Sequence, residues 1–202
     1  MKTLYLVRHG ETNSNLEKKF QGRINTPLNE TGLAGAQGLV ERFAPITVES
    51  IYCSTLQRTR QTATPLAAAR SLPIWEEAAL QEISFGKWEG MPFEEISQQW
   101  PKEYDLLYTA PSKLDLGGEE NFQQAQERGW EAVKKILAQQ SEDSSAVAVS
   151  HGGLIRLILC ALLKINIDEM WKFSLNNVSI TSIFESPRVG LGIKYINNIK
   201  NL

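Results

Sequence analysis

The sequence is short of cysteine and of excess positive charge, and each shortage excludes a class of protein. Two cysteines among 202 residues cannot form the disulfide framework of a small secreted fold. The 21 lysine and arginine residues stand against 23 acidic ones, so the net charge of −2 argues against a general nucleic-acid binder. A local basic pocket for a small anion remains compatible with this balance. Hydrophobic residues make up 42% of the chain, which is ample for a packed core.

Long apolar runs are missing as well. The most apolar stretch, 154–163, contains Arg156 and is followed by Lys164, so it is too short and too charged to cross a membrane. Near the N-terminus, Arg8 comes too early to leave room for the apolar region of a signal peptide. We therefore expect a soluble, cytoplasmic protein without membrane or nucleic-acid partners. Nothing in the sequence indicates its oligomeric state.

Metal-ligand spacing is also absent from the sequence. The two histidines lie far apart, the cysteines form no closely spaced pair, and the acidic residues form no calcium-type loop. We therefore expect no bound metal.

Short apolar segments alternate with helical patterns along the chain. Strands are predicted at 4–7, 51–53, 73–75, 146–149, 179–184 and 193–196, and helices at 31–43, 54–69, 121–140 and 154–163. This alternation predicts a three-layer α/β/α sandwich with a mainly parallel sheet. We further expect a long loop at 11–30, a capping box of Ser54 and Gln57 at the start of a helix, and a frayed end at Asn197, Asn198 and Asn201.

Residues 83–118 differ in composition from the rest of the chain. They contain six aromatic residues, three prolines and one predicted helix, which begins at Glu94. This segment is too apolar to stay solvated, so we expect a small helical insert within a single domain that spans residues 1–202. Its aromatic side chains either pack a small core or stack on a flat ligand.

Both histidines occur at the same kind of position. His9 and His151 each follow a predicted strand and precede a glycine, and ligands of open α/β sheets bind at such strand ends. Arg8 precedes the first histidine, and Arg58 lies in the first turn of the helix after the second strand. Their guanidinium forks suit phosphate or carboxylate, and the N-termini of the following helices add N–H donors. Taken singly, each histidine fits a structural role and Arg58 a surface position. Together they predict an anion pocket that suits phosphate, with a histidine as the nucleophile.

Several motifs, in chain order, resemble those of the histidine phosphatase superfamily, in its phosphoglycerate mutase-like branch. They are LYLVRHGET at 4–12, Asn15, FQGR at 20–23, TPLNETG at 26–32, CSTLQRT at 53–59, QTA at 61–63, EI at 82–83, FGKWEG at 85–90 and VSHGG at 149–153. The resemblance spans about residues 1–185. One departure is Gly117-Gly118-Glu119-Glu120, where the family often has Gly-Gly-Glu-Ser; we expect Asn121 to cap the following helix instead.

The resemblance implies a metal-independent phosphatase with no organic cofactor and with residues 83–118 as a substrate-selecting cap. The site residues that it implies are His9 as the nucleophile that carries a phosphohistidine, Glu82 as the acid and later the base, Arg8, Arg58 and His151 as ligands of the phosphoryl oxygens, and Asn15, Gln21, Gly22 and Gly152 as further lining of the phosphate site. An ordinary glutamate is ionised at pH 7, so Glu82 needs a reason to hold a proton.

Three functions remain open at this stage. We expect hydrolysis of small phosphate monoesters, by an enzyme of broad specificity or by a dedicated phosphoserine phosphatase or α-ribazole phosphatase of cobalamin synthesis. The alternatives are a phosphoglycerate mutase, which should place basic residues in its cap, and a catalytically dead sensor of phosphorylated ligands. The insert has three lysines against six acidic residues. This balance favours a phosphatase over a mutase and predicts a larger or less charged leaving group.

Overall fold

Six strands form one sheet in the order β3-β2-β4-β1-β5-β6 in a computed structural model that describes residues 1–200. The strands are β1 (Lys2–Arg8), β2 (Ser50–Cys53), β3 (Ile74–Glu76), β4 (Ser145–Ser150), β5 (Ile180–Ser186) and β6 (Gly190–Asn198). The first four strands in spatial order run parallel, and β5 and β6 are antiparallel to their neighbours. The predicted α/β fold with a mainly parallel sheet is therefore confirmed.

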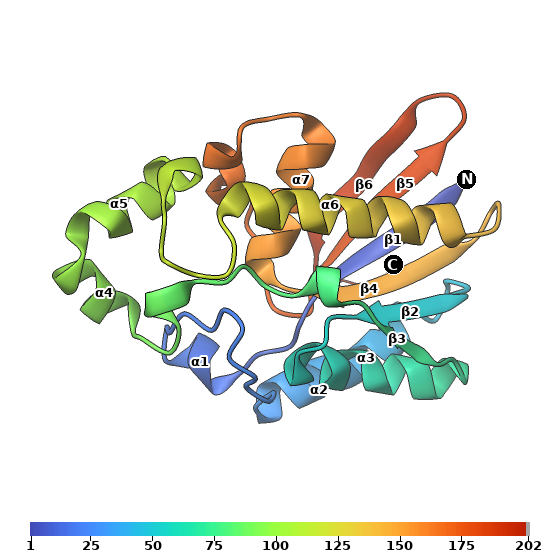
Figure 1. The fold of residues 1–202 in the computed structure, drawn as a ribbon. Helices are drawn as coiled ribbons and strands as arrows, with labels where there is room; N and C mark the ends of the chain where they lie inside the picture. Colours follow the sequence, from blue (N-terminus) through green and yellow to red (C-terminus); the bar gives the residue numbers. More distant parts are fainter. Residues whose placement is uncertain (201–202) are drawn as a thin grey trace.

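Helices cover both faces of the sheet (Figure 1). They are α1 (Asn13–Leu16), α2 (Glu30–Arg42), α3 (Gln57–Arg70), α4 (Phe93–Gln99), α5 (Pro101–Thr109), α6 (Phe122–Gln139) and α7 (Gly152–Leu163), with short 3₁₀ segments at Ala78–Leu80, Gly86–Trp88, Pro111–Lys113 and Ile167–Lys172. Helices α2 and α3 lie on one face, and α6 and α7 lie on the other. Within residues 1–200, no helix is long and apolar enough to span a membrane.

The central strand β1 is buried on both faces. Leu4 and Leu6 pack in one apolar cluster with α6 and α7, whereas Tyr5 and Val7 pack in another with α2 and α3. Because successive side chains of a strand point to opposite faces, an apolar run of this kind requires a covering layer on each side. This burial holds the end of β1, where Arg8 and His9 begin, in a rigid frame.

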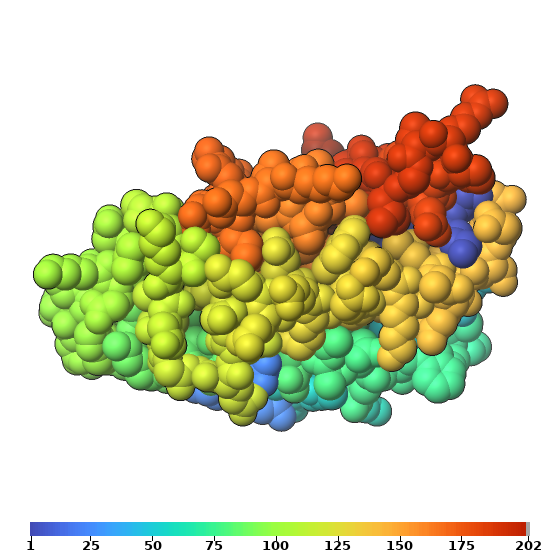
Figure 2. Space-filling view, turned by 45° about the horizontal axis from the view of Figure 1, so that its top comes forward, coloured from blue at the N-terminus to red at the C-terminus, as the bar shows by residue number. Residues whose placement is uncertain are grey.

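The insert lies beyond the carboxyl ends of the parallel strands, at the left of Figure 1, and forms the green lobe of Figure 2. Its fully buried Trp88, Ile96 and Leu107 pack in a third core cluster with Leu157 of α7. The insert contains two helices where the sequence predicted one. Pro101 ends the first helix because a proline disfavours helical backbone at the residue before it, and the same proline begins α5.

Three local predictions were wrong. Ser54 does not cap α3, which begins at Gln57, because the Ser54 hydroxyl contacts His151 instead. The segment 11–30 is not loop throughout, since Thr12 caps the short helix α1. Asn197 and Asn198 belong to β6, where pairing with β5 orders them; Asn201 lies outside the described residues.

The predicted cap of the long helix is confirmed. Asn121 caps α6 in a capping box with Gln124. Cys53 and Cys160 are buried and free, and burial raises the pKa of each thiol to about 11.

Candidate active site

The two histidines meet because their strands are parallel neighbours. Arg8 at the end of β1 lies opposite Ser150 at the end of β4. The residue that follows each strand is a histidine, so both histidines lie at the same sheet edge. The backbone N–H of His9 donates to the carbonyl of Ser150 at 2.9 Å, and the ring centroids of His9 and His151 are 5.2 Å apart.

The His9 ring is held in one tautomer. Its Nδ1 lies 2.7 Å from the carbonyl oxygen of Gly10, which only accepts hydrogen bonds, so Nδ1 carries the proton. The lone pair of a neutral ring is then on Nε2. Burial, followed by the charges of Arg58 and Arg8, lowers the pKa of His9 well below its ordinary value. His9 is therefore an uncharged imidazole with a free Nε2 lone pair at neutral pH.

His151 is fully buried and holds Arg58. Its Nδ1 accepts a hydrogen bond from Nε of Arg58 at 3.2 Å, which leaves the proton on Nε2 to be donated to the Ser54 hydroxyl at 2.8 Å. Burial and the nearby Arg58 and His9 lower the pKa of His151 well below the ordinary value. The ring lies behind the guanidinium and does not line the cavity described below.

Two arginines bring positive charge to the strand ends. Arg58, in the first turn of α3, is fully buried and donates to the carbonyls of Ile24 and Gly22 at 2.8 and 2.7 Å. Burial lowers the pKa of Arg58 to about 10, which still leaves it charged at pH 7. Arg8 donates from Nη1 to the carbonyl of Leu175, whereas its buried Nε has no partner within residues 1–200. That N–H is a donor available to an anion.

The predicted polar lining offers amide N–H groups. Gln21 Oε1 accepts hydrogen bonds from the hydroxyls of Thr12 and Thr26, and Asn15 Oδ1 accepts from the N–H of Thr12 and from Asn177. Since both amide oxygens face donors of the protein, each side chain is oriented with its NH₂ group left to bind an acceptor. Such donors suit the oxygens of a phosphoryl group.

Glu82 occupies the N-terminus of α7. Its carboxylate accepts hydrogen bonds from the backbone N–H groups of Gly153 and Leu154 at 3.0 and 2.8 Å, and from Ile83 at 3.0 Å. We predicted that this helix start offers its N–H groups to a phosphate-like anion; two of these groups donate to the carboxylate of Glu82 instead. Arg128 on α6 fixes the preceding backbone by donating to the carbonyls of Ala79 and Gln81.

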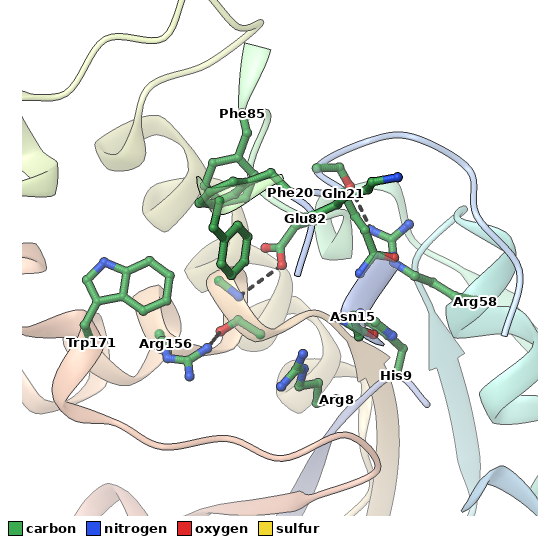
Figure 3. A pocket seen from close by; sticks show the side chains of 15 residues that line it. Arg8, His9, Asn15, Phe20, Gln21, Arg58, Glu82, Phe85, Arg156 and Trp171 are labelled. Atoms are coloured by element: carbon green, nitrogen blue, oxygen red, sulfur yellow. Dashed lines mark hydrogen bonds between the residues drawn. The ribbon is translucent and has the colours of Figure 1, made fainter. Parts of the chain in front are cut away.

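These side chains surround one cavity of about 200 Å³ (Figure 3). The residues that line it are Arg8, His9, Asn15, Lys19, Phe20, Gln21, Gly22, Arg58, Glu82, Phe85, Phe93, Gly152, Gly153, Arg156 and Trp171. Every predicted site residue except His151 is among them. Among residues 1–200, no cluster of three or more His, Cys, Asp or Glu side chains has the arrangement of a metal site.

Sequence reasoning missed Arg156, Trp171 and Lys19. Arg156 was detectable, because it lies one helical turn after Gly152 on the helix that starts at the strand end. We also expected the acidic insert to set the charge around the leaving group, and this was wrong. The insert contributes only Phe85 and Phe93 to the cavity. Its charged side chains lie elsewhere.

Known proteins resemble this chain over its whole length. A sequence model of the histidine phosphatase superfamily (branch 1) matches residues 4–198. Phosphoserine phosphatase 1 of Hydrogenobacter thermophilus is 30% identical over 197 residues, which cover 96% of this chain and 92% of that protein. The adenosylcobalamin/alpha-ribazole phosphatase of Escherichia coli is 29% identical over 194 residues, covering 92% and 94%. The solved structure of Bacillus stearothermophilus YhfR superposes with a TM-score of 0.92 at 31% identity, covering 99% of this chain and 98% of that one.

Proposed function

Because the chain belongs to branch 1 of the histidine phosphatase superfamily, as its motifs predicted, and is a phosphoric monoester hydrolase, we propose that it cleaves small phosphate monoesters through a phosphohistidine on His9. The observation that carries this proposal is the tautomer of His9. The hydrogen bond from Nδ1 to Gly10 leaves the Nε2 lone pair in a cavity lined by guanidinium groups. A neutral nucleophile facing a cationic site is what attack on a phosphate dianion requires.

In the first step, the Nε2 lone pair of His9 attacks phosphorus, and the P–O bond to the leaving group breaks in line. Arg8 and Arg58 neutralise charge on the phosphoryl oxygens, and Asn15, Gln21, Gly22 and Gly152 supply further polar contacts. Glu82 gives its proton to the departing oxygen, which leaves as the alcohol.

In the second step, water attacks the phosphorus of the phosphohistidine. Glu82, now a carboxylate, accepts a proton from that water as the P–N bond breaks. The products are inorganic phosphate and a neutral His9, ready for another cycle. We assign His151 a part in this cycle through Arg58, whose Nε it holds; direct contact of His151 with a phosphoryl oxygen stays a prediction.

The size and lining of the cavity favour a leaving group of a few carbon atoms. A volume of about 200 Å³ is below the roughly 300–1,000 Å³ of pockets for drug-sized ligands. That size disfavours α-ribazole phosphate, which carries a ribose and a flat base. A mutase should place basic residues of its cap beside the substrate, but the two insert residues at the cavity are phenylalanines. The role of 83–118 as a cap and the cytoplasmic location stay proposals.

Rapid quenching with a phosphate ester, followed by mass spectrometry, tests the nucleophile. We expect an acid-labile phosphoryl adduct on His9 and none in His9→Ala. Tight phosphate binding without an adduct or turnover would instead indicate a sensor.

A panel of p-nitrophenyl phosphate, phosphoserine, 3-phosphoglycerate and α-ribazole phosphate, scored for free phosphate and for isomerised product, tests the reaction. Release of phosphate supports a phosphatase, and isomerised 3-phosphoglycerate a mutase. Glu82→Gln should reduce kcat/KM for alkyl esters more than kcat/KM for the nitrophenyl ester. An equal loss on both would contradict the acid role.

A further inference from the structure

Two arginines face each other across Gly152. A side-chain Cβ built on Gly152 would lie 3.0 Å from Nη1 of Arg156 and 3.2 Å from Nε of Arg8. Burial lowers the pKa of Arg156 to about 10, and the charge of Arg8 is the second-largest cause of this shift. Two like charges this close in a half-enclosed cavity repel one another. The carboxylate of Glu82 offsets part of this repulsion, since it raises the pKa of both arginines, and a bound anion offsets more of it.

Arg156 is fixed in place on its own side of the cavity. Its Nε donates to the carbonyl of Phe173 at 2.9 Å, and its Nη1 donates to the carbonyl of Gly152 at 3.0 Å. The guanidinium also lies over the ring of Trp171, 5.0 Å from the centroid. Nη2 makes no hydrogen bond within residues 1–200. The group is therefore oriented before any ligand binds, and it keeps a donor for one.

Arg156 lies on the leaving-group side of the cavity. In Figure 3, Arg8 is between His9 and Arg156, and Arg156 is followed by Trp171. In-line displacement places the leaving group opposite the attacking Nε2 of His9. A phosphoryl group bound between His9, Arg8 and Arg58 thus extends its ester substituent toward Arg156 and the aromatic wall.

The charges of the cavity also favour a substrate with a second anionic group. Four cationic side chains line the cavity, namely Arg8, Lys19, Arg58 and Arg156. The only carboxylate among the described residues that line it is that of Glu82. Lys19 already pairs with Glu17 at 2.6 Å, so the three arginines remain. With His9 neutral and Glu82 holding the proton that it donates in the proposed first step, a phosphate monoester dianion neutralises two of these three positive charges. One arginine charge is then left for a second anionic group, and Arg156 is the arginine farthest from His9 in Figure 3.

We propose that Arg156, supported by Trp171, binds a carboxylate on the leaving group, so that the preferred substrates are short phosphate monoesters that carry a carboxylate. The planar fork of Arg156 suits the two oxygens of a carboxylate, and Phe20, Phe85 and Phe93 cover the short carbon chain between the two anionic ends. The inference rests on the proposed phosphatase activity and names the substrate class of that same site.

A matched pair of esters tests it. Phosphoserine and phosphoethanolamine share the phosphate, the two-carbon link and the amino group, and differ only in the carboxylate. In the native enzyme we expect kcat/KM for phosphoserine to exceed that for phosphoethanolamine by about 10- to 100-fold, the range of a hydrogen bond to a charged group. In Arg156→Gln this ratio should fall to within about threefold of one. Arg188→Gln, which removes an exposed arginine from the β5–β6 turn, should leave the ratio at the native value.

Each outcome decides the proposal. If the native enzyme has nearly the same kcat/KM for both esters, the proposal is overturned without any variant. It is also overturned if Arg156→Gln lowers kcat/KM equally for both esters and so leaves their ratio unchanged, because Arg156 would then serve the phosphoryl group. If Arg156→Gln does not fold, Arg156→Lys keeps the charge without the guanidinium fork and should give an intermediate ratio. A native ratio in Arg156→Lys would refute the claim that the fork binds the carboxylate. Absence of phosphate release from every ester, p-nitrophenyl phosphate included, would refute the phosphatase activity itself.

Discussion

Replacing Gly153 by alanine should disable the acid while leaving the nucleophile in place. An added Cβ would lie 2.6 Å from Oε1 of Glu82 and 2.8 Å from Cδ1 of Ile83. Both atoms are at the ends of flexible side chains, so the fold survives by moving them. Moving the carboxylate breaks the hydrogen bonds that it accepts from the N–H groups of residue 153 and of Leu154. His9, which follows β1, is not among the atoms that the added Cβ would meet.

The expected magnitude follows from what Glu82 contributes. A positioned general acid contributes about 10²- to 10⁴-fold to a rate. We expect kcat/KM for an alkyl ester such as phosphoserine to fall by about 10²-fold in Gly153→Ala. The nitrophenolate of p-nitrophenyl phosphate leaves without a proton, so its formation should slow by less than about tenfold. Loss of the carboxylate's hydrogen bonds should cost about 1–3 kcal/mol of unfolding free energy, partly offset by about 0.5–1 kcal/mol because alanine favours a helix over glycine.

The assay is kcat/KM for both esters, from initial rates of phosphate release at substrate concentrations well below KM, because kcat/KM does not include the later hydrolysis of the phosphohistidine, in which Glu82 acts alike for both esters. Thermal unfolding is measured in parallel. Gly38→Ala is the matched control, because a Cβ at Gly38, inside α2, meets no atom within 4 Å. That variant should keep native activity and gain about 0.5–1 kcal/mol of stability. An equal loss on the two esters in Gly153→Ala would refute the reasoning, since a displaced acid does not slow a leaving group that needs no proton. Unchanged activity on both would refute the assigned role of Glu82.

Three further outcomes are expected. The acid limb of the kcat/KM profile should lie below pH 6.5, because burial and then Arg58 and Arg8 lower the pKa of His9, and a limb above that value would contradict a neutral nucleophile. Below about pH 6.5 the unfolded chain binds protons at His9 and His151, whereas the folded chain does not, because the pKa of each buried ring is lowered. The free energy of unfolding should therefore be highest at pH 7.5 and fall below pH 6.5, by up to about 1.4 kcal/mol per pH unit per histidine, in denaturant titrations between pH 7.5 and 5.5. Finally, the half-buried Glu120 bridges Arg23 and Arg128. Glu120→Gln should therefore cost about 2 kcal/mol of unfolding free energy and lower the Tm by about 4–8 °C in a calorimetric scan. The exposed Glu119 pairs with Arg23, and Glu119→Gln should change the Tm by less than about 2 °C in the same scan.

The meeting of Arg8, His9 and His151 at one sheet edge could be predicted because these residues lie at or just after strand ends, and strands have a strong sequence signal. The run at 4–7 is followed by Arg8 and His9, and the run at 146–149 is followed by Ser150 and His151. Parallel neighbours end at the same sheet edge, so two histidines in equivalent places had to meet. The second helix of the insert and the contact of Ser54 were missed, because a proline boundary and a side-chain partner 97 residues away leave no periodic signal.

The sequence by itself determined the sheet, the edge at which the two histidines meet and the chemistry of the groups gathered there. Apolar periodicity can be read from the order of the residues, and the chemistry of each side chain follows from its residue type. Only the tertiary structure decided which nitrogen of His9 holds the proton, that Glu82 takes the amides of α7, and that Arg156 faces Arg8 across Gly152. These depend on ångström-scale distances between segments far apart in the chain, and such distances are set by packing, which residue order does not display.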